Sequence, residues 1–142
     1  PVLRACATLE FGPVLRYFEV ALEGQLPAVH RHLRQLEIAS DVYLVRWLLT
    51  MFSQSLPLSA CARIWDVVLS EGERALFRAA LALLGLLQPM LLGAGYEESV
   101  MLLQHLPQEG ELPEQQLLAD MARVQLPADE YQALLVDAIV NS

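Results

Sequence analysis

The clearest pattern of apolar and polar positions lies in the second quarter of the chain, where large apolar residues recur at helical spacing. They fall at i, i+1, i+4, i+5, i+8 and i+9 and form one continuous stripe: Tyr43, Leu44, Trp47, Leu48, Met51 and Phe52. Ser40 and Asp41 precede this stripe and are suitable N-cap residues. The pattern therefore predicts an amphipathic helix from Asp41 to about Ser53.

A second amphipathic segment follows after a short connection and opens at Pro57. One face is apolar and the other polar: Leu58, Cys61, Ile64, Trp65 and Val68 against Ser59, Arg63, Asp66 and Ser70. The segment is expected to end near Ser70, with Gly72 as its C-cap. Because the connection is short, we expect the two apolar faces to pack as an antiparallel pair, with Trp47, Phe52 and Trp65 as core anchors.

Glycine and proline residues divide the rest of the chain into further predicted helices. These cover approximately residues 14–22, 27–36, 73–87, 96–106, 114–124 and 128–140, after an apolar stretch over residues 1–11. Glu23-Gly24 is expected to end the first of them, and Gln88-Pro89 the third. The segment 73–87 is apolar on every face, which predicts a buried helix, and its uninterrupted apolar stretch is too short for a membrane span. Short loops and the lack of a repeat predict one all-α domain over residues 1–142, an irregular multi-helix bundle.

Composition strengthens the helical interpretation and narrows the possible partners. The chain has 30 leucines and 17 alanines against 12 valines, 3 isoleucines and 2 threonines, and the first two are strong helix formers. Its formal net charge is −8, and all 9 basic residues are arginine, which argues against binding to nucleic acid. Cys6 and Cys61 lack metal-site spacing and are typical of buried residues in a reducing, cytoplasmic compartment.

Recognisable catalytic or cofactor chemistry is missing from the sequence. Neither a P-loop nor a dinucleotide-binding glycine motif occurs. His30 and His32 stand two positions apart and point to different faces of a helix, and His105 is distant, so we expect no metal site. A Cys–His nucleophile pair would have to be assembled from cysteines flanked by apolar residues. We therefore expect no catalytic, cofactor-binding or metal-binding residues.

Three features of the central segment occur together: the run Arg46-Trp-Leu-Leu-Thr-Met-Phe-Ser-Gln54, the opener Leu-Pro57-Leu, and Arg63-Ile-Trp-Asp66 before Glu-Gly72. Over roughly residues 13–107 the chain resembles the TBC-domain Rab GTPase-activating proteins. The resemblance implies an all-helical domain of two subdomains whose partner is a GTP-loaded Rab-type GTPase. The motif residues expected to serve the structure or the interface are Arg46, Trp47, Phe52, Gln54, Pro57, Arg63, Trp65, Asp66 and Gly72.

What the resemblance implies about catalysis depends on two residues supplied to the GTPase. An arginine from I-x-x-D-x-x-R neutralises charge on the γ-phosphoryl group, and a glutamine from Y-x-Q orients the attacking water. Both motifs belong to the family's N-terminal subdomain, and neither occurs in this sequence, since the stretch from Ile38 has Leu44 where the arginine should be.

We therefore expect the chain to be the C-terminal scaffold subdomain of a Rab activator in vesicle trafficking, with residues 108–142 as extra helices. On this interpretation it is not itself an enzyme, is inactive alone, needs the N-terminal subdomain as a partner, and is cytoplasmic with recruitment to membranes through Rab. The alternative is a pseudo-GAP or helical adaptor that binds Rabs or other proteins without stimulating hydrolysis.

The polar motif residues leave alternatives open. Arg63 and Asp66, three positions apart, could form a surface ion pair worth about 0–1 kcal/mol, or could contact the adjoining subdomain or the GTPase. Gln54 ends its predicted helix, and we expect it to make a simple loop contact rather than to serve as the glutamine finger.

Overall fold

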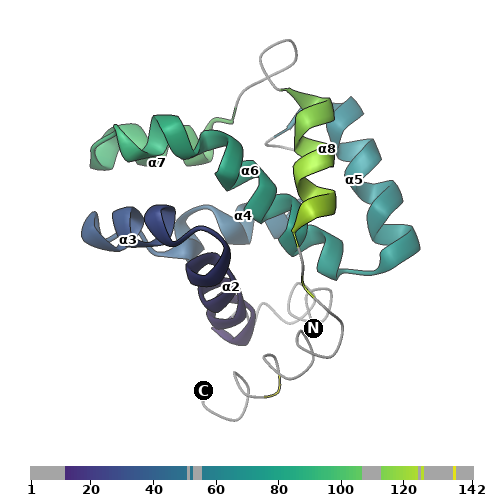
Figure 1. The fold of residues 1–142 in the computed structure, drawn as a ribbon, viewed down its shortest axis with the longest axis horizontal. Coiled ribbons are helices and arrows are strands. Elements are labelled where there is room, and N and C mark those ends of the chain that lie inside the picture. Colours follow the sequence, from purple (N-terminus) through teal and green to yellow (C-terminus); the bar gives the residue numbers. More distant parts are fainter. Residues whose placement is uncertain are drawn as a thin grey trace.

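The computed structural model describes residues 12–50, 52, 56–106, 113–124, 126 and 136. These residues form seven α-helices and one 3-10 helix, with no strand among them (Figure 1). The elements are α2 (Gly12–Gln25), α3 (Pro27–Gln35), η1 (Ser40–Val42), α4 (Leu44–Leu49), α5 (Leu58–Glu71), α6 (Arg74–Leu92), α7 (Tyr96–Gln104) and α8 (Glu114–Arg123). The all-α prediction is confirmed. The expected apolar stretch 1–11 and the expected helix 128–140 lie outside the described residues, apart from position 136.

Helix α6 is the centre of the fold, as its apolar composition predicted. It contacts α2, α3, α4, α5, α7 and α8, and Figure 1 shows α5 and α8 on one side of it and α2 and α3 on the other. It is also the one described helix long and apolar enough to cross a membrane by length and composition, with 61% of its apolar window buried. Packing on so many sides is typical of the core helix of a globular bundle.

Two predicted helix ends are wrong, because Gly24 and Pro89 lie within helices and do not stop them. Helix α2 continues through Glu23-Gly24 to Gln25. Helix α6 continues through Pro89 to Leu92, although an internal proline costs about 3 kcal/mol. The carbonyl that loses its donor there belongs to Gly85, and the turn beyond Pro89 contains Leu91, which is fully buried. Burial of Leu91 offsets part of the cost of the proline.

The predicted helix 41–53 is broken into two short elements, η1 and α4, although the described residues of its apolar stripe are buried as expected; Met51 lies outside the described residues. Tyr43 separates the two with a φ of −127° and a ψ of −39°. Phe52 has a φ of 68°, and its N–H donates to the Trp47 carbonyl at 2.8 Å. The rings of Tyr43 and Phe52 lie 4.9 and 5.8 Å from the Trp47 ring. The chain therefore bends at both ends of α4 and keeps these aromatic residues in one buried cluster.

The expected antiparallel pair of residues 41–53 and 57–70 is also not the main contact of the core. Helices α4 and α5 each pack against α6 instead, because α6 offers an apolar surface on every side. Cys61 and Ile64 of α5 are buried and Trp65 and Val68 are partly buried, but Leu58 is 72% exposed. The apolar face predicted for α5 is therefore one residue too long at its start.

Helix α8 makes the most extensive helix–helix contact of the described residues, with α6. Leu117 and Met121 are buried against the core. Two arginines of α6 bind carbonyl groups in the last turn of α8 and just beyond it. Arg78 Nε donates to the Met121 carbonyl at 3.2 Å, and Arg74 Nη1 donates to the Leu126 carbonyl, past the end of the helix, at 2.7 Å. The last carbonyls of a helix have no partner within it, so these bonds fix the end of α8 on the core.

Candidate functional site

The motif tryptophan Trp47 is an internal anchor. Its side chain is fully buried, and the indole Nε1–H donates to the Leu103 carbonyl at 3.3 Å. Leu103 lies in the last turn of α7, where helix carbonyls have no helical partner. Trp47 therefore ties α4 to α7 and is not available to a binding partner.

The motif phenylalanine Phe52 holds the other end of this cluster. It is fully buried, and the Cys61 thiol donates to its carbonyl at 3.1 Å. Burial raises the pKa of the Cys61 thiol, and the backbone hydrogen bonds lower it less. A nucleophilic cysteine needs a lowered pKa and access to solvent. Cys61 has neither, so its role is structural.

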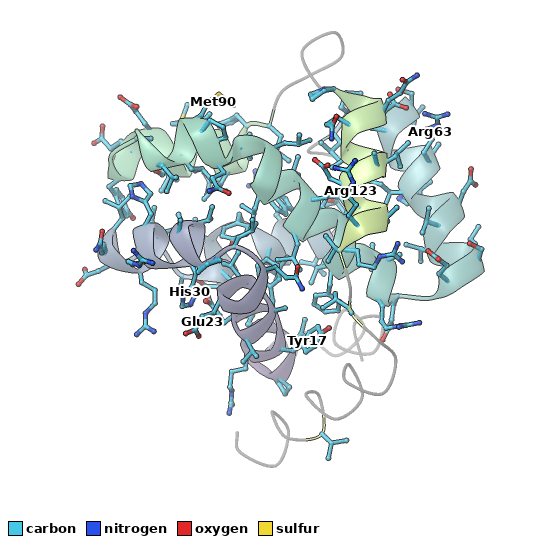
Figure 2. All side chains as sticks on the ribbon, in the orientation of Figure 1. Tyr17, Glu23, His30, Arg63, Met90 and Arg123 are labelled. Atoms are coloured by element: carbon cyan, nitrogen blue, oxygen red, sulfur yellow. The ribbon has the colours of Figure 1, made fainter. Side chains whose placement is uncertain are left out.

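The exposed face of α5 carries Arg63 and Asp66, but the structure does not pair them. Arg63 Nη1 lies 3.7 Å from Oε1 of Glu114 on α8, and the Ser59 hydroxyl donates to Oε2 of the same carboxylate at 3.0 Å. No ion pair joins Arg63 to Asp66 in the described part of the chain, so the ion-pair alternative is wrong for these two. Arg63 instead connects α5 to α8, on the outer side of the bundle (Figure 2), and Asp66 is left exposed.

The remaining motif residues lie at element boundaries or on the surface. Arg46 is exposed on α4, Pro57 is the residue before α5, and Gly72 follows α5 with a φ of 93°. That φ favours glycine and confirms the predicted C-cap position. Gln54 lies outside the described residues. Arg46 lies on α4, whereas Arg63 lies on α5 beside Glu114 of α8, so these two motif arginines belong to different elements.

Trp65 fits the expected core role only in part. It is partly buried and packs against the core cluster, whereas Trp47 and Phe52 are fully buried. The motif therefore divides into an internal set that builds the fold and a set of separate exposed side chains, chiefly Arg46, Arg63 and Asp66.

A polar cluster that the sequence did not reveal lies where α2, α3 and η1 meet. The Glu19 carboxylate lies 3.3 Å from His30 Nε2 and accepts a hydrogen bond from the Ser40 N–H, also at 3.3 Å. Figure 2 shows Glu23 and His30 on the same side of the molecule. An open cleft of about 440 Å³ is lined there by Glu19, Val20, Glu23, His30, Arg34, Glu37, Ile38 and Ala39. No sequence periodicity signals this cluster, because its members come from three separate elements.

The buried hydroxyl of Tyr43 beside this cluster keeps its proton at neutral pH. Burial of Tyr43, and secondly the charge of Glu19, raise the pKa of its phenol well above the ordinary value. Among the described residues, no group of three His, Cys, Asp or Glu side chains could hold a metal ion. His32 has a structural contact, because its Nε2 lies 3.0 Å from the carbonyl oxygen of Ala94.

Comparison with known proteins agrees with the motif and with the helical architecture. The family model described as the Rab-GTPase-TBC domain matches residues 10–92. The chain belongs to the Rab-GTPase-TBC domain family. The family resemblance is thereby confirmed, and the family model covers residues 13–92 of the stretch that carries it.

Three relatives show how far the similarity to this TBC-domain chain extends. TBC1 domain family member 14 of Homo sapiens is 36% identical over 129 residues, covering 89% of this chain and 18% of that protein. Drainin of Dictyostelium discoideum is 34% identical over 121 residues, covering 85% and 27%. TBC1 domain family member 12 of Xenopus tropicalis is 33% identical over 129 residues, covering 89% and 19%.

The chain thus spans about a fifth to a quarter of the length of these relatives. A match that covers 89% of the 142 residues must include α8, wherever in the chain the match begins. The similarity therefore extends beyond the family model to the helix that makes the largest contact with α6.

Proposed function

We propose that this chain is the C-terminal scaffold region of a Rab GTPase-activating protein, and that it shapes the binding site without supplying catalytic residues. The observation that carries the proposal is the TBC-domain match over residues 10–92, in a chain that contains neither I-x-x-D-x-x-R nor Y-x-Q. TBC-domain proteins as a class activate GTPases, which places the chemistry in the GTPase and the assisting groups in its regulator.

Two features of the described residues support a scaffold role. Trp47 and Phe52 are fully buried in the core, and Arg63 lies 3.7 Å from Glu114. A catalytic arginine must instead reach the γ-phosphoryl group of a bound GTPase. On this proposal the chain is cytoplasmic, meets membranes through its Rab, and works together with an N-terminal subdomain.

Single-turnover phosphate release from a panel of GTP-loaded Rabs tests the proposal. The 142-residue chain alone should leave hydrolysis unchanged, whereas a full-length protein with both subdomains should accelerate one Rab by roughly 10³–10⁵-fold, the contribution of an arginine finger. Arg46→Ala and Arg63→Ala in the full-length protein should each retain most of this activity, because neither residue acts on phosphate.

The same experiment separates the alternatives. A full-length protein that binds a GTP-loaded Rab without accelerating hydrolysis would establish the pseudo-GAP or adaptor role instead. Stimulation by the 142-residue chain alone, abolished by Arg46→Ala or Arg63→Ala, would overturn the scaffold proposal and place catalysis in this chain.

A further inference from the structure

A groove runs between the end of α6 and one side of α7, away from the Glu19–His30 cluster. Its volume is about 720 Å³, and it is lined by Met90, Glu97, Glu98, Met101, Leu102 and His105. Met90 is 49% exposed and Met101 is 58% exposed. Figure 2 shows Met90 on the outer surface of the molecule. Exposed methionines are adaptable contact residues, since their flexible side chains fit partners of different shape.

The register of α7 arranges these side chains in order along the helix. Glu97 precedes Met101 by four residues, and Glu98 precedes Leu102 by four, so each pair lies on one side of the helix. The first turn of α7 therefore forms the acidic end of the groove, and the next turn forms its apolar end. A segment that lies along α7 would contact the carboxylates of Glu97 and Glu98 at the start of the helix. One turn further on it would contact the apolar side chains of Met101 and Leu102.

The two carboxylates are available to a partner. No ion pair or hydrogen bond joins Glu97 or Glu98 to another residue in the part of the chain that the structure describes, and both are exposed. His105 is the one basic side chain of the groove lining. Both glutamates lie in the first turn of α7, where the helix dipole stabilises negative charge. This interaction does not occupy the carboxylate oxygens with a hydrogen-bond partner.

Charge decides which occupant fits this groove. A second copy of the chain carries the same net charge of −8, and an anionic membrane surface would be repelled in the same way. The segments of this chain next to α7 and α8 are no better suited, because residues 107–112 and 125–142 contain no Lys or Arg. A cationic segment of another protein is the occupant that complements the acidic rim.

We propose that the α6–α7 groove binds an amphipathic helix of a partner protein, with apolar side chains on the methionines and a Lys or Arg one turn away against Glu97 and Glu98. A helix in an apolar groove is a recurring recognition mode, read through side chains three and four residues apart. The groove volume of about 720 Å³ lies within the range of known ligand pockets. This site does not depend on the proposed role in GTPase activation.

Fluorescence anisotropy with a labelled leucine–lysine peptide, patterned as an amphipathic helix, tests the proposal on the 142-residue chain. A matched leucine–glutamate peptide should bind at least about tenfold more weakly. Glu97→Gln and Glu98→Gln should each weaken the lysine peptide by about threefold, and Met101→Ser by about tenfold. Binding should also weaken with added salt, because the rim charges are exposed.

Two matched controls keep the result specific to the groove. Glu23→Gln changes an exposed carboxylate at the α2–α3 cleft, and Leu69→Ser changes an apolar residue that is 85% exposed on α5. Both should leave peptide binding unchanged, and circular dichroism should show that all five variants are as helical as the unsubstituted chain. Equal binding of the two peptides, or equal losses in the control variants, would overturn the proposal.

Discussion

A Trp47→Phe substitution removes the indole N–H that joins α4 to α7 while keeping an aromatic ring in the core. The N–H donates to the Leu103 carbonyl at 3.3 Å, and neither residue is exposed to solvent. The substitution leaves a buried carbonyl without this donor in the last turn of α7. It also removes apolar atoms from a ring that lies 4.9 Å from Tyr43 and 5.8 Å from Phe52.

The expected loss has two components. Loss of a buried hydrogen bond costs about 0.5–1.5 kcal/mol, and the 3.3 Å distance between Nε1 and the carbonyl oxygen places this bond in the lower half of that range. The missing ring atoms cost about 1–2 kcal/mol in lost burial and residual cavity. The free energy of unfolding should therefore fall by about 1.5–3 kcal/mol. Trp65→Phe is the matched control, and should cost about 1 kcal/mol or less, because Trp65 is only partly buried.

Urea unfolding followed by far-UV circular dichroism measures both variants, since the substitutions themselves alter tryptophan fluorescence. If the slope of the free energy of unfolding against urea concentration is the same in both variants, their two unfolding transitions can be compared. If Trp47→Phe cost no more than Trp65→Phe, the indole N–H would contribute nothing to the α4–α7 contact, and the assignment of Trp47 as an internal anchor would fail.

Two further substitutions test the polar and backbone features near α3 and η1. Tyr43→Phe removes a buried hydroxyl with no hydrogen-bond partner in the described ranges, so it should raise the free energy of unfolding by about 1 kcal/mol. Burial raises the pKa of Tyr43 above the ordinary value of 10.0, so the phenol ionises in the unfolded chain at a lower pH than in the folded one. The free energy of unfolding should therefore decline above about pH 10. An equal decline in the Tyr43→Phe variant would contradict this. Glu37→Gly should stabilise by about 0.5–1 kcal/mol, because Glu37 has a φ of 60°. Glu37→Ala, measured by the same thermal unfolding, should show no gain, and an equal gain would trace the effect to charge.

Burial was predictable from the sequence because it follows from side-chain spacing. The stripe through Tyr43, Trp47 and Phe52 is buried as the spacing predicts, and α6 is the core helix that its composition predicts. The same spacing did not predict the backbone path, because it cannot show that Phe52 takes a φ of 68°. A stripe of buried residues constrains which side faces inward, but several backbone paths satisfy it.

Polar contacts were much less predictable, because they join elements that are distant in sequence. Arg63 had Asp66 as a possible ion-pair partner three residues away, yet it lies 3.7 Å from Glu114 on α8. The contact of Glu19 with His30 likewise depends on how α2 and α3 cross. Neither contact has a local signature, so only the folded arrangement reveals it.

The motif that identifies the family thus reports mainly on the core, and this limits what it says about function. Trp47 and Phe52 would be required at their positions by packing alone, whether or not the protein activates a GTPase. Partner choice must depend on exposed groups, and the most distinctive of these in the described residues are the methionines and glutamates of the α6–α7 groove. That groove includes α7 residues beyond the family match, which ends at residue 92. Variation among relatives along α7 would therefore change binding partners while leaving the family motif, and the fold it encodes, unaltered.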